Sequence, residues 1–276
     1  MLRKLFKYEL KSTAKLMLLV YMIMVAVTVL GCIAMAVSAA PSGDSPVKDF
    51  FIVIGITSYV LGIFALFIVT YVYMCVHFYR TMYSDRGYLT HTLPVSHHSI
   101  LNVKLLVSLF WMLCSILLLL LSVLALIAAA SRGAIFRTDF SYFLSEFYRT
   151  SGMHFGALML YLLVATILSC LLYLLMVFTS ASIGQLFSQH KVAASVIAGV
   201  VLYFAEQIIS TIIMVASGYV MLMNDISADT SAVSAVSEFS DIFTMLLTPT
   251  IIYSVILSVI YYVVCYRITK KHINLE

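Results

Sequence analysis

The chain has 276 residues, of which 63% are hydrophobic and only 10% are charged. Soluble domains carry about 25% charged residues, so this composition excludes an ordinary soluble protein. The formal net charge of +4 is small and gives no indication of a nucleic-acid partner. We therefore predict an all-α integral membrane protein.

The first segment, LRKLFKYELKSTAKLM at residues 2–17, is amphipathic when it is drawn as a helix. Apolar side chains occupy one arc, and the opposite arc carries basic side chains: Arg3, Lys4, Lys7, Lys11 and Lys15. A helix of this kind lies along the surface of an anionic bilayer, so residues 1–15 are predicted to form an interfacial helix that binds membrane lipids. Glu9 interrupts the apolar arc. Snorkelling, or pairing with a neighbouring lysine, is favoured over a docking contact, because isolated charges on such faces usually find a local partner.

Six apolar stretches are each long enough to cross a bilayer, which takes about 20 residues of helix. They cover roughly residues 16–38, 50–77, 105–130, 155–181, 193–217 and 245–266. The segments between them are too short to fold separately, so residues 1–276 are predicted to form a single transmembrane domain. The first apolar run follows basic residues, as in a signal peptide, but at about 22 residues it exceeds the usual 7–15 residues. We expect an uncleaved first span.

Lysine and arginine decide the orientation, because cytoplasmic loops retain positive charge. With the amino terminus inside, twelve basic residues fall on the inner side, and the remaining four, Lys48, Arg132, Arg137 and Arg149, fall outside. Both termini are therefore predicted to be cytoplasmic, in a multi-pass protein of the cell membrane. The outer segment 218–244 mixes small, acidic and apolar residues and is expected to contain short helices at the membrane surface.

The longest polar segment on the predicted inner side, residues 78–104, connects spans two and three. Pro94 disfavours helical backbone at Leu93, so a short helix that begins near Ser84 should end by Thr92. Ser96 is well placed to cap a second helix that continues into span three. The segment also holds three histidines, His91, His97 and His98, but their spacing and the absence of companion ligands do not indicate a metal site.

No motif indicates catalysis. The S-x-x-K matches at residues 12–15 and 188–191 lack the companion motifs of that chemistry. A P-loop of the form G-x-x-x-x-G-K-[ST] is absent, so any use of ATP requires another chain. We expect a non-enzymatic chain that binds no cofactor, and we interpret its five cysteines as small apolar core residues.

Glu206 lies near the middle of the fifth span, within VLYFAEQIIST at residues 201–211. A charge at that depth costs about 2.5–3.5 kcal/mol on insertion scales, so its side chain should face the bundle interior, whether charged or protonated. Two roles stay open. Gln207, Ser210 or Tyr203 of a neighbouring helix or subunit could satisfy it structurally, or it could belong to the pathway of a cationic or amphipathic substrate.

Four features combine in this chain: a basic start with KLFKYELK at 4–11, six spans, DRGYLTHTLPVSHHSILNVKLL at 85–106, and SIGQLFSQHK at 182–191. Together they resemble the permease subunit of type-2 ATP-binding-cassette (ABC) exporters of Gram-positive bacteria. One departure is NVKLL at 102–106, where the family commonly has a serine before the lysine.

The resemblance implies a dimer of two permeases, alike or different, with two cytoplasmic ATPase subunits that bind ATP and magnesium. It also implies that residues 1–15 form an elbow helix and that the 78–104 segment carries a coupling helix. The residues that would contact the ATPase are Tyr88, Leu89, Thr92, Leu93 and Pro94, with Gly184 and Gln185 in a secondary contact. An aromatic and aliphatic tip stiffened by proline suits this task.

The expected function is export of a peptide, such as an antimicrobial peptide, or of a hydrophobic drug. The segment could instead be an anchored surface loop. The alternative functions are an ATP-independent channel and a sensor or immunity protein that acts by binding. An intramembrane enzyme is a third class, for which the sequence shows no motif.

Overall fold

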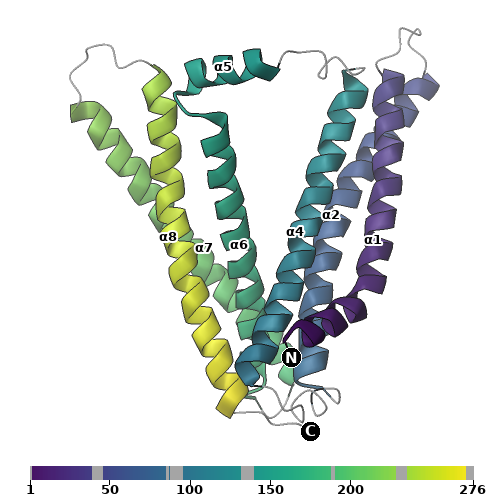
Figure 1. Cartoon of the computed structure of the whole chain (residues 1–276), viewed down its shortest axis with the longest axis vertical. Coiled ribbons are helices and arrows are strands. Elements are labelled where there is room, and N and C mark those ends of the chain that lie inside the picture. The colour runs from purple at the N-terminus through teal and green to yellow at the C-terminus, as the bar shows by residue number, and fades with distance from the viewer. Residues whose placement is uncertain are drawn as a thin grey trace. The chain divides into compact units, whose positions relative to one another are not determined.

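The computed structural model describes residues 2–38, 46–84, 87, 96–131, 140–187, 190–227 and 235–271. The described chain forms helices joined by short connections and contains no strand. The helices are α1 (Leu2–Ser38), α2 (Pro46–Met82), α4 (His97–Ala130), α5 (Phe140–Ser151), α6 (Phe155–Gly184), α7 (Lys191–Ser227) and α8 (Ala235–Lys271), as Figure 1 shows.

Six of these helices, all except α5, are long and apolar enough to cross a membrane. Large apolar side chains cover their outer surfaces: Leu61 is 63% exposed and Ile197 is 64% exposed. Such surfaces are unfavourable in water and suit the hydrocarbon of a bilayer, where helices satisfy their own backbone hydrogen bonds. The prediction of an all-α, multi-pass membrane protein is confirmed.

The helices divide into two compact units. The first unit contains Met1–His77 and Asn102–Asp139, and the second contains Phe78–Leu101 and Phe140–Glu276. Helices α2 and α4 contribute to both units, because the divisions fall inside them. Each unit is described separately.

In the first unit, α1 and α2 approach each other closely. A Cβ atom at Gly55 would overlap Ala34, and one at Gly62 would lie 2.8 Å from Val27 Cγ1. Small residues at helix contacts allow this proximity in membrane proteins. Met24, Tyr59 and Leu66 form the buried core beside these contacts.

Hydrogen bonds link α4 to both of these helices within the first unit. Tyr21 of α1 donates to the Trp111 carbonyl at 2.8 Å, and the Tyr59 hydroxyl of α2 lies 2.9 Å from Ser122 Oγ. Burial of these hydroxyl groups is tolerated because each has a partner.

The second unit is built on α6, α7 and α8, with the end of α2 and the first turn of α4 packed against them. Phe78 stacks on Phe178 of α6 with ring centroids 3.8 Å apart. The Tyr83 hydroxyl lies 2.7 Å from Ser182 Oγ of α6 and 3.1 Å from Thr269 Oγ1 of α8. Tyr83 therefore ties the end of α2 to two span helices.

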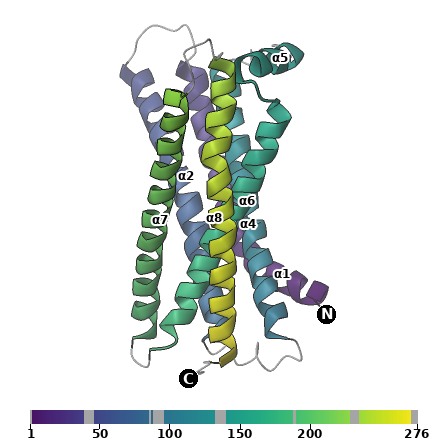
Figure 2. The same ribbon diagram turned by 90° about the vertical axis from the view of Figure 1, so that its left-hand side faces the viewer.

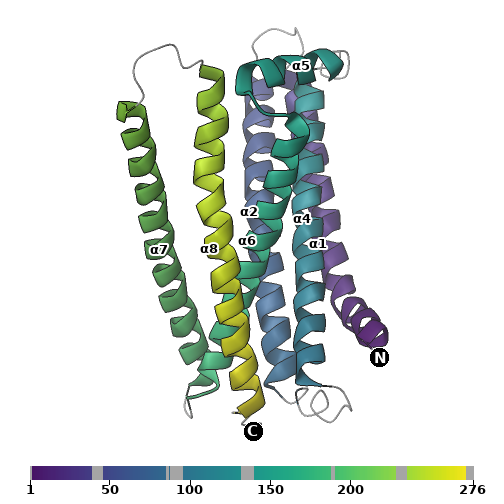
Figure 3. The same cartoon turned by 60° about the vertical axis from the view of Figure 1, so that its left-hand side comes forward.

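Helix α5 was not anticipated from the sequence. It lies across the amino-terminal end of α6 (Figure 3), and Phe147 packs edge to face with Phe155 at the start of α6. Its apolar residues recur at Phe140, Phe143, Leu144 and Phe147, which is the spacing of an amphipathic helix. This spacing could have predicted the helix from the sequence, although the segment between spans three and four is too polar for a span.

The expectation of short helices at 218–244 differs from the structure. Helix α7 continues to Ser227, and α8 already begins at Ala235, so the described parts of this segment are extensions of long helices. Pro249 lies inside α8, as expected for the sixth span. Thr250 Oγ1 donates to the Leu246 carbonyl at 2.7 Å in the turn beside it.

Candidate functional site

The amino-terminal turns of α1 bend away from the axis of the rest of the helix (Figure 2). Within these turns the basic side chains of Arg3, Lys4, Lys7 and Lys11 are exposed, whereas Glu9 and Leu10 are only partly exposed. The bend places the Glu9 side chain against α2 and α4 instead of leaving it among the neighbouring lysines. The predicted role of these turns as an interfacial elbow helix stays a prediction.

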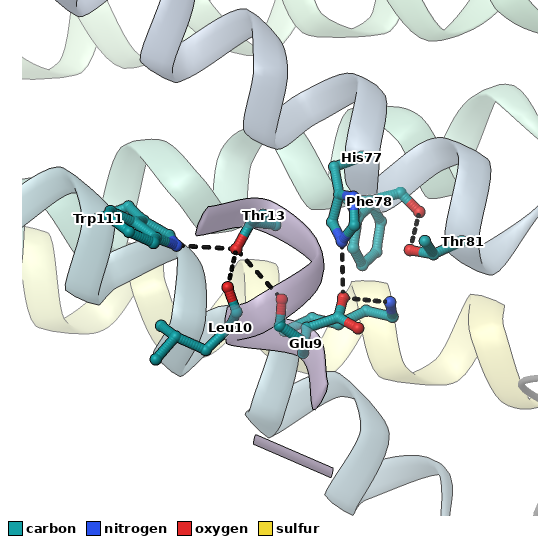
Figure 4. A network of polar contacts seen from close by, with 8 residues as sticks. Glu9, Leu10, Thr13, His77, Phe78, Thr81 and Trp111 are labelled. Atoms are coloured by element: carbon teal, nitrogen blue, oxygen red, sulfur yellow. Dashed lines mark hydrogen bonds and ion pairs between the residues drawn. The ribbon is translucent and has the colours of Figure 1, made fainter. Parts of the chain in front are cut away.

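Glu9 is the centre of a polar junction between three helices of the first unit (Figure 4). Its Oε1 atom accepts a hydrogen bond from Lys104 Nζ at 2.8 Å and lies 2.9 Å from His77 Nε2. A carboxylate only accepts hydrogen bonds, so His77 Nε2 is assigned as a donor. The Lys104 side chain is only 6% exposed and that of Glu9 17%.

The favoured sequence interpretation of Glu9, pairing with a neighbouring lysine, was wrong. Its cationic partner is 95 positions away in α4. A helical wheel shows only which residues are neighbours within one helix. It therefore cannot predict a contact that depends on the packing of α1 against α4. The less favoured alternative, a docking contact, describes the geometry.

Trp111 and Thr13 form the second part of the junction. Trp111 Nε1 donates to Thr13 Oγ1 at 2.8 Å, and Thr13 Oγ1 in turn lies 3.1 Å from the carbonyls of Glu9 and Leu10 (Figure 4). Thr13 is fully buried. The bent amino-terminal turns are thus fixed to α4 by one charged contact and one neutral contact.

The candidate coupling segment begins directly after one partner of Glu9 and ends at the other. His77 immediately precedes residues 78–104, and Lys104 is the last residue of that segment. Tyr88, Leu89, Thr92, Leu93 and Pro94 lie outside the described residues, so their predicted contact role stays a prediction. Ser96, two positions after Pro94, is described.

Ser96 caps α4 as predicted. Helix α4 begins at His97, and the Ser99 backbone N–H lies 3.4 Å from Ser96 Oγ. The following histidine also has a structural role that the sequence did not indicate. His98 stacks on Tyr266 of α8 with ring centroids 3.6 Å apart, and its Nδ1 lies 3.2 Å from the Tyr262 hydroxyl. These contacts hold the start of α4 on α8 in the second unit.

The predicted secondary contact lies at the end of α6. The helix ends at Gly184, where a Cβ atom would overlap Ser195 Oγ of α7. Gln185 follows and is 5% exposed, and its Nε2 has no hydrogen-bond partner among the described residues. His190 has φ 56°, in the left-handed region, immediately before α7 begins. The close approach of α7 at Ser195 accounts for a glycine at the end of α6.

Glu206 is buried as predicted, with 5% of its surface exposed, on a helix whose other side chains are mostly exposed. The residues considered as its partners bond elsewhere within α7: Gln207 Nε2 donates to the Tyr203 hydroxyl at 3.1 Å, and Ser210 Oγ donates to the Gln207 carbonyl at 3.0 Å. The Tyr253 hydroxyl of α8 donates to the Glu206 carbonyl at 3.4 Å.

Comparison of the chain with protein-family models, with curated proteins and with solved structures finds no match. Among the residues that the structure describes, no three His, Cys, Asp or Glu side chains are grouped as metal ligands would be.

Proposed function

We propose that the chain is the transmembrane subunit of an ABC exporter. In this proposal it is not an enzyme: it couples ATP hydrolysis on a separate cytoplasmic ATPase subunit to export of a peptide or a hydrophobic small molecule. ATP and magnesium bind to that partner, and the chain itself holds no cofactor. A second permease, identical or different, completes the membrane part of the complex.

One observation carries the proposal. Glu9, the only carboxylate of the amino-terminal turns, bonds to His77 and to Lys104. His77 immediately precedes the 78–104 segment, and Lys104 is its last residue. A load applied to that segment by a soluble partner would reach α2, α4 and the amino-terminal turns together. Such a connection is what a lever between an ATPase and membrane helices requires, whereas a simple surface loop needs none.

Two further features support the same proposal. The six apolar helices provide the membrane domain, and the sequence patterns at 4–11, 85–106 and 182–191 resemble those of ABC permeases. The excess of lysine and arginine on one side supports cytoplasmic termini in the cell membrane. A cytoplasmic 78–104 segment would then be accessible to the ATPase.

The test is purification of the affinity-tagged chain from the membranes of its own host in mild detergent. We expect a P-loop ATPase to copurify in stoichiometric amount and the preparation to hydrolyse ATP, with an unrelated tagged membrane protein as the control. Recovery of the folded chain without any P-loop ATPase would instead favour a channel, or a sensor or immunity protein that acts by binding.

A further inference from the structure

A cavity of about 220 Å³ lies among α6, α7 and α8 in the second unit. Glu206 of α7 lines it, together with polar side chains from all three helices: Ser169, Tyr173, Gln207, Ser210, Thr250, Tyr253 and Ser254. No lysine, arginine or histidine is among the described residues that line it. The only group there that can carry a full charge near neutral pH is a carboxyl group.

Glu206 is incompletely satisfied within the chain. Its side chain is buried, and Oε2 has no hydrogen-bond partner among the described residues. Buried polar atoms are nearly always hydrogen-bonded, so an exception points to a partner outside the described chain. A purely structural carboxyl group would be expected to have both oxygen atoms paired.

Three of the hydroxyl groups that line the cavity, those of Ser210, Thr250 and Ser254, donate their hydrogens to backbone carbonyls. Ser210 Oγ donates to the Gln207 carbonyl, Thr250 Oγ1 lies within bonding distance of two backbone carbonyls, and Ser254 Oγ donates to the Thr250 carbonyl. Each hydroxyl has one hydrogen to donate and two lone pairs that accept. These three oxygens and Glu206 Oε2 therefore offer acceptors to a ligand, and a ligand with several N–H donors matches them.

A larger apolar groove of about 610 Å³ adjoins this cavity, because Tyr253 lines both. Its walls include Ile213 of α7 and Ile252 and Ile256 of α8. Ile213 lies seven positions after Glu206, which is two helical turns along the same face of α7. The two spaces together form one site with an anionic end and an apolar end.

We propose that this site binds an organic amine, with its ammonium group at Glu206 Oε2 and its apolar body in the groove formed by α7 and α8. The ammonium supplies a positive charge and N–H donors to the unpaired Glu206 oxygen and to the hydroxyl acceptors beside it, and it neutralises a carboxylate that is costly to bury alone. The binding of such an amine does not depend on the proposed function. Its being the exported cargo does.

The binding test uses 1-aminoadamantane, a compact apolar cage with one primary ammonium group, and 1-adamantanol as its neutral counterpart. The full chain is reconstituted in nanodiscs at pH 7, and binding of tritiated 1-aminoadamantane is measured with empty nanodiscs subtracted. We expect saturable binding that the alcohol displaces at least about tenfold less well than unlabelled amine. Absence of saturable binding, or equal displacement by the two compounds, would overturn the proposal.

Variants locate the site. Glu206→Gln should weaken amine binding by about tenfold or more, because it removes the charge and keeps the shape. Glu146→Gln, a change at an exposed carboxylate of α5, should leave binding unchanged. Equal binding by Glu206→Gln and the unaltered chain would overturn the proposal. If Glu206→Gln does not fold, the comparison of amine with alcohol on the unaltered chain still decides, since it needs no variant.

The two proposals can fail separately. Copurification of a P-loop ATPase without amine binding would support the export function and contradict amines as its substrate class. Amine binding by a chain that never recruits an ATPase would support the binding site and contradict the export function.

Discussion

Lys104 Nζ lies 2.8 Å from Glu9 Oε1, although 95 positions separate the two residues. The contact joins the first turns of the chain to the end of the candidate coupling segment. Lys104 is almost completely buried, and it has a carboxylate beside it, as buried cations usually do.

Lys104→Met should destabilise the protein by about 3 kcal/mol, because it leaves the Glu9 carboxylate largely buried without its cation. The double variant Glu9→Gln with Lys104→Met should recover part of this loss, since no charge is then stranded. Thermal unfolding in detergent micelles measures both. Arg149→Met, which breaks an exposed ion pair with Glu146, should show no measurable change. Equal effects of Lys104→Met and Arg149→Met would contradict the account of the junction.

Thr13→Val should cost about 1–3 kcal/mol, because it leaves the buried Trp111 N–H without an acceptor. Trp111 is the only tryptophan in the chain, so its fluorescence reports this change directly. Thr28→Val removes a hydroxyl that bonds only to its own helix, at the Met24 carbonyl, and serves as the matched control. Unchanged tryptophan emission in Thr13→Val would argue against the hydrogen bond.

Gly184→Ala should destabilise the packing of α6 on α7 by about 1–3 kcal/mol, since the added methyl group overlaps Ser195. Gly156→Ala in the same helix meets nothing within 4 Å and should be neutral or stabilising by up to about 1 kcal/mol. The difference in melting temperature between the two variants is the measurement. A stabilising effect at Gly184 would show that the close approach is not required.

Orientation can be tested with single cysteines in a chain whose five native cysteines are replaced by alanine. Ser145→Cys on α5 should react with a membrane-impermeant maleimide in intact cells, because the charge bias predicts that this helix lies outside. Leu186→Cys, at a half-exposed position after α6, should react only after permeabilisation. The reverse pattern would invert the proposed topology.

Local features of this fold could be predicted from the sequence. Hydrophobicity and length predict the spans, Ser96 is a good cap, and the cost of a charge in a bilayer predicts the burial of Glu206. Each of these depends on a few adjacent residues or on the solvent. The fourth span, expected to end near residue 181, ends at Gly184.

Features that depend on packing between distant segments could not be predicted in this way. The partners of Glu9 lie in α2 and α4, and the partner of His98 lies in α8, so no periodicity within one segment points to them. The unpaired oxygen of Glu206 likewise could not be predicted, because it depends on which side chains of α6 and α8 lie beside it. Helix α5 is different, because its amphipathic spacing was present and was overlooked.

The central claim is that residues 88–94 connect this chain to an ATPase. The most direct measurement is the amount of P-loop ATPase recovered with the tagged chain carrying both Tyr88→Ala and Leu93→Asp, relative to the unaltered chain and to Tyr142→Ala, a change at an exposed tyrosine of α5. The account predicts that the double variant inserts in the membrane at normal levels but loses most of the ATPase, while Tyr142→Ala retains it. Normal ATPase recovery with the double variant would contradict the account.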